Sequence, residues 1–132
     1  MPCLPTVDAR LRLGTVRATG RVTGAEIAAA NEALYSDPAW RPGFDELWDC
    51  SEISEFVVDL GEIREVARME VEGKERIGPG RVALVMTRDV VEMIGQLYRV
   101  LVVESERPVE IVRTVEAAAE WLGLDAVPEA LR

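Results

Sequence analysis

The sequence contains no histidine. Histidine is the commonest general base at neutral pH and the commonest metal ligand, so its absence argues against imidazole-dependent catalysis. A glycine-rich phosphate loop is also missing, because Gly14 and Gly20 are too far apart and Gly61 stands alone. We therefore expect no catalytic residue, no metal site and no cofactor.

Cysteine is scarce, and the two residues present are Cys3 and Cys50. Cys50 lies in a predicted strand and has no neighbouring base to activate it, so we expect a buried, unreactive thiol. The segment 1–5 lacks the basic and apolar regions of a secretory signal, which argues against a disulfide and favours a cytoplasmic protein.

Long apolar runs and an excess of basic residues are also absent. No apolar run approaches the roughly 20 residues that span a bilayer, so we expect no stable membrane insertion. The net charge is -9, with 24 acidic against 15 basic residues. Such a protein repels phosphates, and we expect no nucleic-acid partner.

What is present fits one globular domain over residues 1–132. The chain is 48% hydrophobic and 30% charged, as in ordinary soluble proteins. Predicted strands alternate with predicted helices, which is typical of a mostly parallel sheet. We expect a single-domain α/β sandwich with about five strands and about four flanking helices, followed by a loosely packed tail at 124–132.

The element boundaries follow from caps and breakers. Thr23 with Glu26, and Asp59 with Glu62, have the spacing of capping boxes that begin helices. Gly20 is expected to interrupt the chain before the first of these helices. The predicted strands are 4–7, 11–19, 44–50, 81–86 and 108–112, and the predicted helices begin at 23, 60, 89 and 114, the third running through 103.

The strand 44–50 is expected at the centre of the sheet, parallel to 81–86. In a strand, Leu47 and Asp49 point to one face, and Glu46, Trp48 and Cys50 to the other. The strand is expected to end at 49–51, and open α/β sheets bind ligands beyond the carboxyl ends of their strands.

Acidic and aromatic residues near this strand supply two candidate site residues. Five acids in this region are expected to form a solvated rim, namely Asp45, Glu46, Asp49, Glu52 and Glu55. Asp49 is a candidate because of its position, although bonding to nearby backbone amides also explains it. Trp40, between two prolines, is expected to be partly exposed and is a candidate interface residue.

The second and third helices carry apolar stripes that we expect to face each other. Gly61 and Gly95 lower helix stability by about 1 kcal/mol each relative to alanine, which favours helices that can part from the sheet. Close packing around the glycines is the simpler alternative. The stripes comprise Ile63, Val66, Ala67 and Met69, and Val90, Met93, Ile94, Leu97 and Tyr98; from them we take Ile63, Met69, Met93, Ile94, Leu97 and Tyr98 as candidate binding residues.

Several stretches in order resemble a known family. They read GRVTGAE (20–26), DPAWRPG (37–43) with LWD (47–49), RVALV (81–85) with GQLY (95–98), and VEIV (109–112) with EAAAEWLG (116–123). Through them the chain resembles the SpoIIAA-like proteins of the STAS-type superfamily of bacterial domains, whose fold is also similar to that of the CRAL-TRIO lipid-binding domains. The resemblance implies a four- or five-stranded sheet flanked by helices, without an established common activity.

The resemblance also implies a turn that carries a phosphoacceptor serine in anti-sigma-factor antagonists. The matching turn here reads Val58, Asp59, Leu60 and Gly61, without a hydroxyl residue, so we expect no phosphorylation switch. Two functions remain open. One is a non-enzymatic regulatory or protein-interaction module that binds a protein partner or forms a homodimer. The other is a carrier that holds an apolar small molecule or lipid between sheet and helices.

Overall fold

In the computed structural model, which describes residues 2–132 apart from the side chains of Val90 and Glu104, five strands form one sheet in chain order. β1 pairs antiparallel with β2, and all later pairs are parallel. This confirms the predicted mostly parallel sheet with β3 beside β4, and β1 and β5 lie at its edges. The strands are β1 (Cys3–Asp8), β2 (Leu13–Thr23), β3 (Asp45–Val57), β4 (Val82–Val85) and β5 (Val109–Val112).

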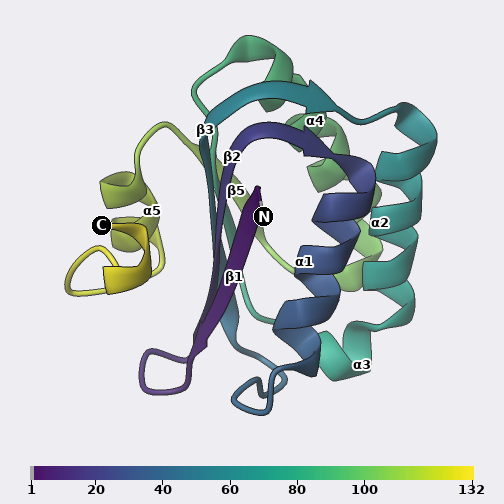
Figure 1. Cartoon of the computed structure of the whole chain (residues 1–132). Coiled ribbons are helices and arrows are strands. Elements are labelled where there is room, and N and C mark those ends of the chain that lie inside the picture. Colours follow the sequence, from purple (N-terminus) through teal and green to yellow (C-terminus); the bar gives the residue numbers. More distant parts are fainter. Residues whose placement is uncertain (1) are drawn as a thin grey trace.

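Helices cover both faces of the sheet unequally. The chain crosses the sheet in one direction from β2 to β5, so crossover helices of one hand fall on one face. Accordingly α1, α2 and α4 lie together on one side, and α5 lies with the C-terminal segment on the other (Figure 1). The helices are α1 (Gly24–Ser36), α2 (Leu60–Glu72), α3 (Lys74–Ile77), α4 (Asp89–Leu101) and α5 (Val115–Trp121), with short 3₁₀ helices at Val103–Ser105 and Glu129–Leu131.

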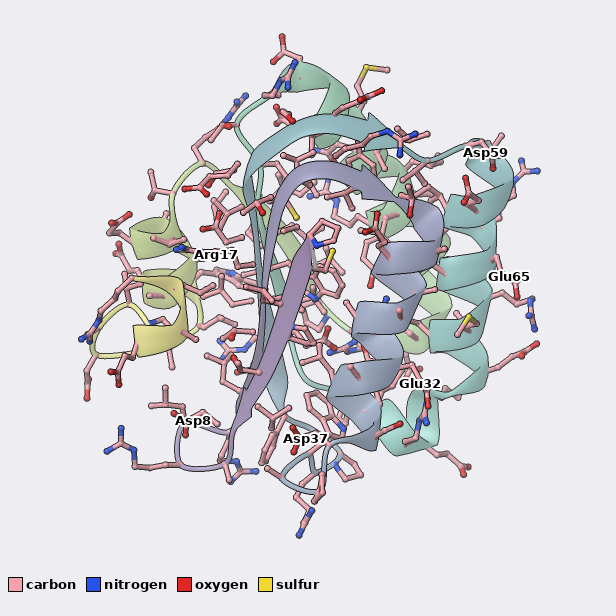
Figure 2. The ribbon with its side chains drawn as sticks, viewed as in Figure 1. Asp8, Arg17, Glu32, Asp37, Asp59 and Glu65 are labelled. Carbon is pink, nitrogen blue, oxygen red and sulfur yellow. The ribbon has the colours of Figure 1, made fainter. Side chains whose placement is uncertain are left out.

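Both predicted capping boxes are present. The Thr23 side chain accepts from the Glu26 amide at 3.3 Å, and that of Asp59 accepts from the Glu62 amide at 2.8 Å. Asp59 thus lies at the start of α2, as Figure 2 shows. The third predicted helix is α4, which ends at Leu101 before the 3₁₀ turn instead of running through Val103.

The long strands β2 and β3 differ from the prediction. β3 does not end at Cys50, because it pairs with β2 as far as Thr23 opposite Val57. Nor does Gly20 interrupt β2; the strand passes through it with φ of 68° and shifts register beside it. Such irregularities bend a strand. Beyond the end of β4 the two strands therefore form an arch that curves over toward the helices (Figure 1).

The tail also differs from the prediction. Leu131 is buried against the α5 face of the sheet, and its carbonyl accepts a hydrogen bond from Arg17 Nη2 at 2.8 Å. Residues 124–132 are therefore packed, since their apolar side chains cover a sheet face that α5 alone leaves open.

Candidate functional site

An apolar cavity of about 60 Å³ lies between the sheet and helices α1, α2 and α4. The strands reach it through alternate residues, because in β3 the side chains of Trp48 and Cys50 point to the helix face. In α4, Gly95 lies so close to Met86 that an added Cβ would be 2.5 Å from its sulfur. Residues lining the cavity include Ile27, Trp48, Cys50, Phe56, Ile63, Val66, Leu84, Met86, Ile94 and Tyr98.

A buried group of two acids and one arginine lies beside this cavity. Glu46, Glu70 and Arg107 are 1%, 4% and 5% exposed. Arg107 Nη2 donates to Glu46 Oε2 at 2.7 Å, and its Nε donates to the Gly80 carbonyl at 2.9 Å. Arg107 Nη1 lies 3.9 Å from Glu70 Oε2, too far for a direct hydrogen bond. We call these three residues the acid–arginine cluster.

Neighbouring side chains donate to both carboxylates. Tyr35 donates to Glu46 Oε2 at 2.7 Å, and Trp48 Nε1 donates to Glu46 Oε1 at 3.0 Å. The hydroxyl of Tyr98, on α4, donates to Glu70 Oε2. Glu46 is therefore well supplied with donors, whereas Glu70 depends on Tyr98 and on a more distant guanidinium.

The surroundings of Glu70 favour its neutral form. Burial raises its pKa to about 7, and the charge of Glu46 adds to that rise, against the opposing effects of Arg107 and of the Tyr98 hydrogen bond. The pKa values of Tyr35 and Tyr98 lie well above the ordinary value, chiefly through burial. Both phenols therefore remain hydrogen-bond donors, and Glu70 changes its charge near neutral pH.

A second, more polar cavity of about 30 Å³ lies among α1, α2 and α3. It shares Asn31, Val66 and Glu70 with the apolar cavity. Arg76 and Glu32, which also line it, form an ion pair of 2.9 Å between α3 and α1, and Glu32 lies on the side of α1 near α3 (Figure 2). Glu70 thus lies where an apolar space meets a polar one.

The two free thiols, Cys3 and Cys50, are buried and held in unreactive forms. Burial raises the pKa of the Cys50 thiol, followed by the effect of the Asp49 charge, and burial raises that of Cys3 to about 11. Thiols in this state are poor nucleophiles. Among residues 2–132, no cluster of three or more side chains suited to hold a metal ion is found.

The structure brings together only some of the predicted site residues. Ile63, Ile94 and Tyr98 line the apolar cavity, and Met69, 37% exposed, lines the polar one. Leu97 lies partly buried on α4. Met93 was expected to face α2 but is 71% exposed, so it lies on the outer side of α4. The side chain of Val90 lies outside the described residues.

Trp40 and Asp49 lie elsewhere than expected. Trp40 is buried, packs edge-on against Tyr35 and Phe44, and donates through Nε1 to the Arg76 carbonyl. Its predicted exposure is therefore wrong, because the loop folds its ring into the core. Asp49 is buried within β3, not at the end of the strand.

Asp49 faces away from the apolar cavity. Its Oδ1 accepts from the Ser51 amide at 3.1 Å and hydroxyl at 2.6 Å, and its Oδ2 lies 3.9 Å from Arg17 Nη2. Figure 2 shows Arg17 on the α5 side of the sheet. The predicted solvated rim is accordingly wrong for Glu46 and Asp49, which are buried on opposite faces.

The sequence reasoning missed all three members of the acid–arginine cluster as site residues. Glu70 follows Ile63, Val66 and Ala67 at helical spacing, so its position in the buried stripe of α2 could have been noticed. Glu46 likewise alternates with Trp48 and Cys50. Arg107 has no such signal, because it lies in an irregular segment before β5.

Comparison with solved structures identifies a similar protein of known fold. It is an uncharacterized protein of the DUF3478 family from Shewanella loihica PV-4, whose crystal structure has a SpoIIAA-like fold. The TM-score is 0.56 at 15% identity, with 83% of each chain covered. No protein-family model and no curated protein matches the chain significantly. The likeness shows that this chain has a SpoIIAA-like fold, as the sequence predicted, and at this identity it shows the fold alone.

None of the helices in residues 2–132 combines the length and the apolar character required to cross a bilayer.

Proposed function

We propose that this SpoIIAA-like domain is a non-catalytic binding module that holds a small apolar ligand between its sheet and helices α1, α2 and α4. The observation that carries the proposal is the apolar cavity, which side chains from β3, β4, α2 and α4 line together. Cavities lined by aliphatic and aromatic groups stay dry and bind small apolar molecules. A binding role also agrees with the raised pKa of the Cys50 thiol and the lack of histidine.

The volume of the cavity limits the size of the ligand that it can hold. A cavity of about 150 Å³ accepts benzene, so about 60 Å³ accepts a shorter hydrocarbon group. Met86 gives the wall some freedom, because an unbranched thioether repacks easily. We therefore expect only the shortest alkyl groups to bind directly, and longer ones, including a butyl chain, to displace Met86 and α4.

Binding is tested by titrating 1-butanol and following the NMR signals of Ile63 and Ile94. We expect saturable shifts in the wild-type protein and affinity about tenfold weaker in Gly95→Ala, equivalent to about 1.4 kcal/mol. The added methyl pushes Met86 toward the cavity, since they would otherwise be 2.5 Å apart. The free energy of unfolding of Gly95→Ala should differ from that of the wild type by less than about 1 kcal/mol, because the higher helix propensity of alanine offsets the cost of repacking Met86.

Gly61→Ala is the matched control. Gly61 is exposed in the first turn of α2, and the nearest atom to an added Cβ is an Asp59 carboxylate oxygen at 3.3 Å. This variant should gain about 1 kcal/mol of stability and bind 1-butanol as the wild type does. Equal affinities in Gly95→Ala and wild type, or shifts that never saturate, would contradict ligand binding in this cavity.

A protein partner is the second candidate, because α4 and the 3₁₀ turn expose a row of apolar side chains. Met93, Val100 and Val103 are 71%, 68% and 70% exposed. Met93 and Val100 are seven residues apart and lie on one side of α4, and Val103 follows in the 3₁₀ turn. Exposed apolar side chains that form a contiguous patch are typical of protein interfaces. We take a second copy of the chain as this partner, because a homodimer is one of the expectations from the sequence.

Sedimentation of the wild type at tens of micromolar should show a dimer in rapid exchange, and Met93→Ser with Val100→Ser should shift it to monomer. The stability of this variant should stay within about 0.5 kcal/mol, because both side chains are exposed. Leu4→Ser is the control, since Leu4 is exposed on the edge strand β1. A dimer that dissociates only in Leu4→Ser would place the interface at the sheet edge.

A further inference from the structure

The acid–arginine cluster contains one carboxyl group more than it has cations. Arg107 is paired directly with Glu46 at 2.7 Å and reaches Glu70 only at 3.9 Å. Among the residues that the structure describes, Glu70 Oε2 accepts from Tyr98, and no hydrogen bond reaches the other oxygen. This second oxygen is not among the buried atoms that lack a partner, and Glu70 lines both cavities, so the oxygen is open to a donor from a bound ligand.

Glu70 also lies where a ligand with one polar end would place that end. It lines both cavities, together with Asn31 and Val66. The Tyr35 hydroxyl donates its one proton to Glu46 at 2.7 Å, so Asn31 Oδ1, which lies 3.3 Å from the same hydroxyl, is free to accept from another donor. Acceptors therefore gather at the junction, with the apolar cavity directly beside them.

We infer that the ligand of the apolar cavity ends in a primary ammonium group, bound by the Glu70 carboxylate and the Asn31 side-chain oxygen at the junction of the two cavities. This rests on the proposed function, because the alkyl part is assigned to the apolar cavity. When Glu70 is ionised the cluster has one surplus negative charge, which an ammonium compensates, and the ammonium has three donors for the acceptors present.

An anionic end group fits this site poorly. Arg107 Nη1 has no hydrogen-bond partner among the described residues and would suit an acceptor. However, a carboxylate there would place three negative groups around one guanidinium in a buried site, where like charges repel strongly. A neutral hydroxyl avoids the repulsion but leaves the surplus charge of Glu70 uncompensated.

The charge of Glu70 makes this selectivity depend on pH. The groups that face it are Glu46 from β3, Tyr98 from α4, Tyr35 from α1 and Arg107 from the segment before β5. Since the pKa of Glu70 is raised to about 7, the carboxylate is mostly neutral at pH 6 and mostly ionised at pH 8. An alkylammonium, like that of lysine, keeps its charge at both values.

The experiment compares butylamine, 1-butanol and butyrate by NMR titration at pH 6 and pH 8. We expect butylamine to bind up to about tenfold more tightly at pH 8, following the ionised fraction of Glu70. Binding of 1-butanol should change little, and butyrate should bind more weakly at pH 8. In Glu70→Gln, butylamine should lose its advantage over 1-butanol at pH 8.

The outcomes separate this inference from the proposed function. Butanol bound as tightly as butylamine at pH 8, with no pH dependence for the amine, would overturn the ammonium inference and leave the binding module intact. If none of the three probes saturates, the proposed function itself fails. The pH comparison in the wild type decides the inference even if Glu70→Gln does not fold.

Discussion

Replacement of Arg107 by methionine is expected to destabilise the protein by about 3–5 kcal/mol at pH 8, because removing one partner of a buried ion pair leaves uncompensated charge. Arg107 is 5% exposed and lies between Glu46 and Glu70, which are equally inaccessible. Small domains have only about 5–15 kcal/mol of stability in total. The variant should therefore lie close to unfolding, which urea denaturation measures.

The loss should shrink as the pH falls. Arg107 holds down the pKa of Glu70, so its removal raises that pKa further above the value of the unfolded chain. A carboxyl with a raised pKa binds more protons folded than unfolded, so stability falls as pH rises through that range and recovers below it. We expect a smaller deficit at pH 5 than at pH 8.

Arg68→Met is the matched control. Arg68 also bridges two glutamates, Glu65 and Glu72, but on the exposed side of α2, where Figure 2 shows Glu65 pointing outward. Exposed ion pairs contribute little, so this variant should unfold close to the wild type. Should Arg107→Met unfold completely, adding Glu46→Gln and Glu70→Gln should restore part of the stability. Equal unfolding of Arg107→Met and Arg68→Met would show that the buried cluster is not coupled as described.

Gly78→Ala should produce the second large effect, a loss of about 2–5 kcal/mol. Gly78 has φ of 81° and ψ of 178°, a conformation that only glycine adopts readily and that costs other residues about 1–3 kcal/mol. An added Cβ would lie 2.1 Å from the Gly43 nitrogen, and overpacking adds about 1–3 kcal/mol. The backbone at Gly43 cannot move away easily, because its amide donates a hydrogen bond to the Ile77 carbonyl at 3.0 Å.

Gly123→Ala separates the two contributions. Gly123 has φ of 72°, and nothing lies within 4 Å of an added Cβ. Its replacement should cost about 1–2 kcal/mol from the left-handed backbone alone. Urea unfolding measures the free energy of unfolding of both variants. The extra loss in Gly78→Ala gives the cost of crowding the contact between the loops that precede β3 and β4. Similar losses in Gly78→Ala and Gly123→Ala would mean that this contact adjusts without cost.

The elements themselves could be predicted because their signals are local. A capping box, such as Thr23 with Glu26, involves groups within one turn, and the apolar run 82–85 reflects burial on both faces of a parallel sheet. Some residues of the cavity wall could be predicted for the same reason. Periodicity indicated the inward positions of Ile63 and Ile94, but the outward position of Met93 was missed, since a broad apolar helix does not show which edge of its stripe is covered.

The sequence by itself determined the fold class, the strand order around β3 and β4, and the face on which Glu46, Trp48 and Cys50 lie. These follow from residue spacing along one strand or helix. Only the tertiary structure decided that Glu46 and Glu70 meet Arg107, 61 residues from Glu46 in the chain, and that β2 and β3 arch over the helices. Contacts between distant segments depend on how whole elements pack. The sequence around a buried acidic residue does not show which basic residue will pair with it.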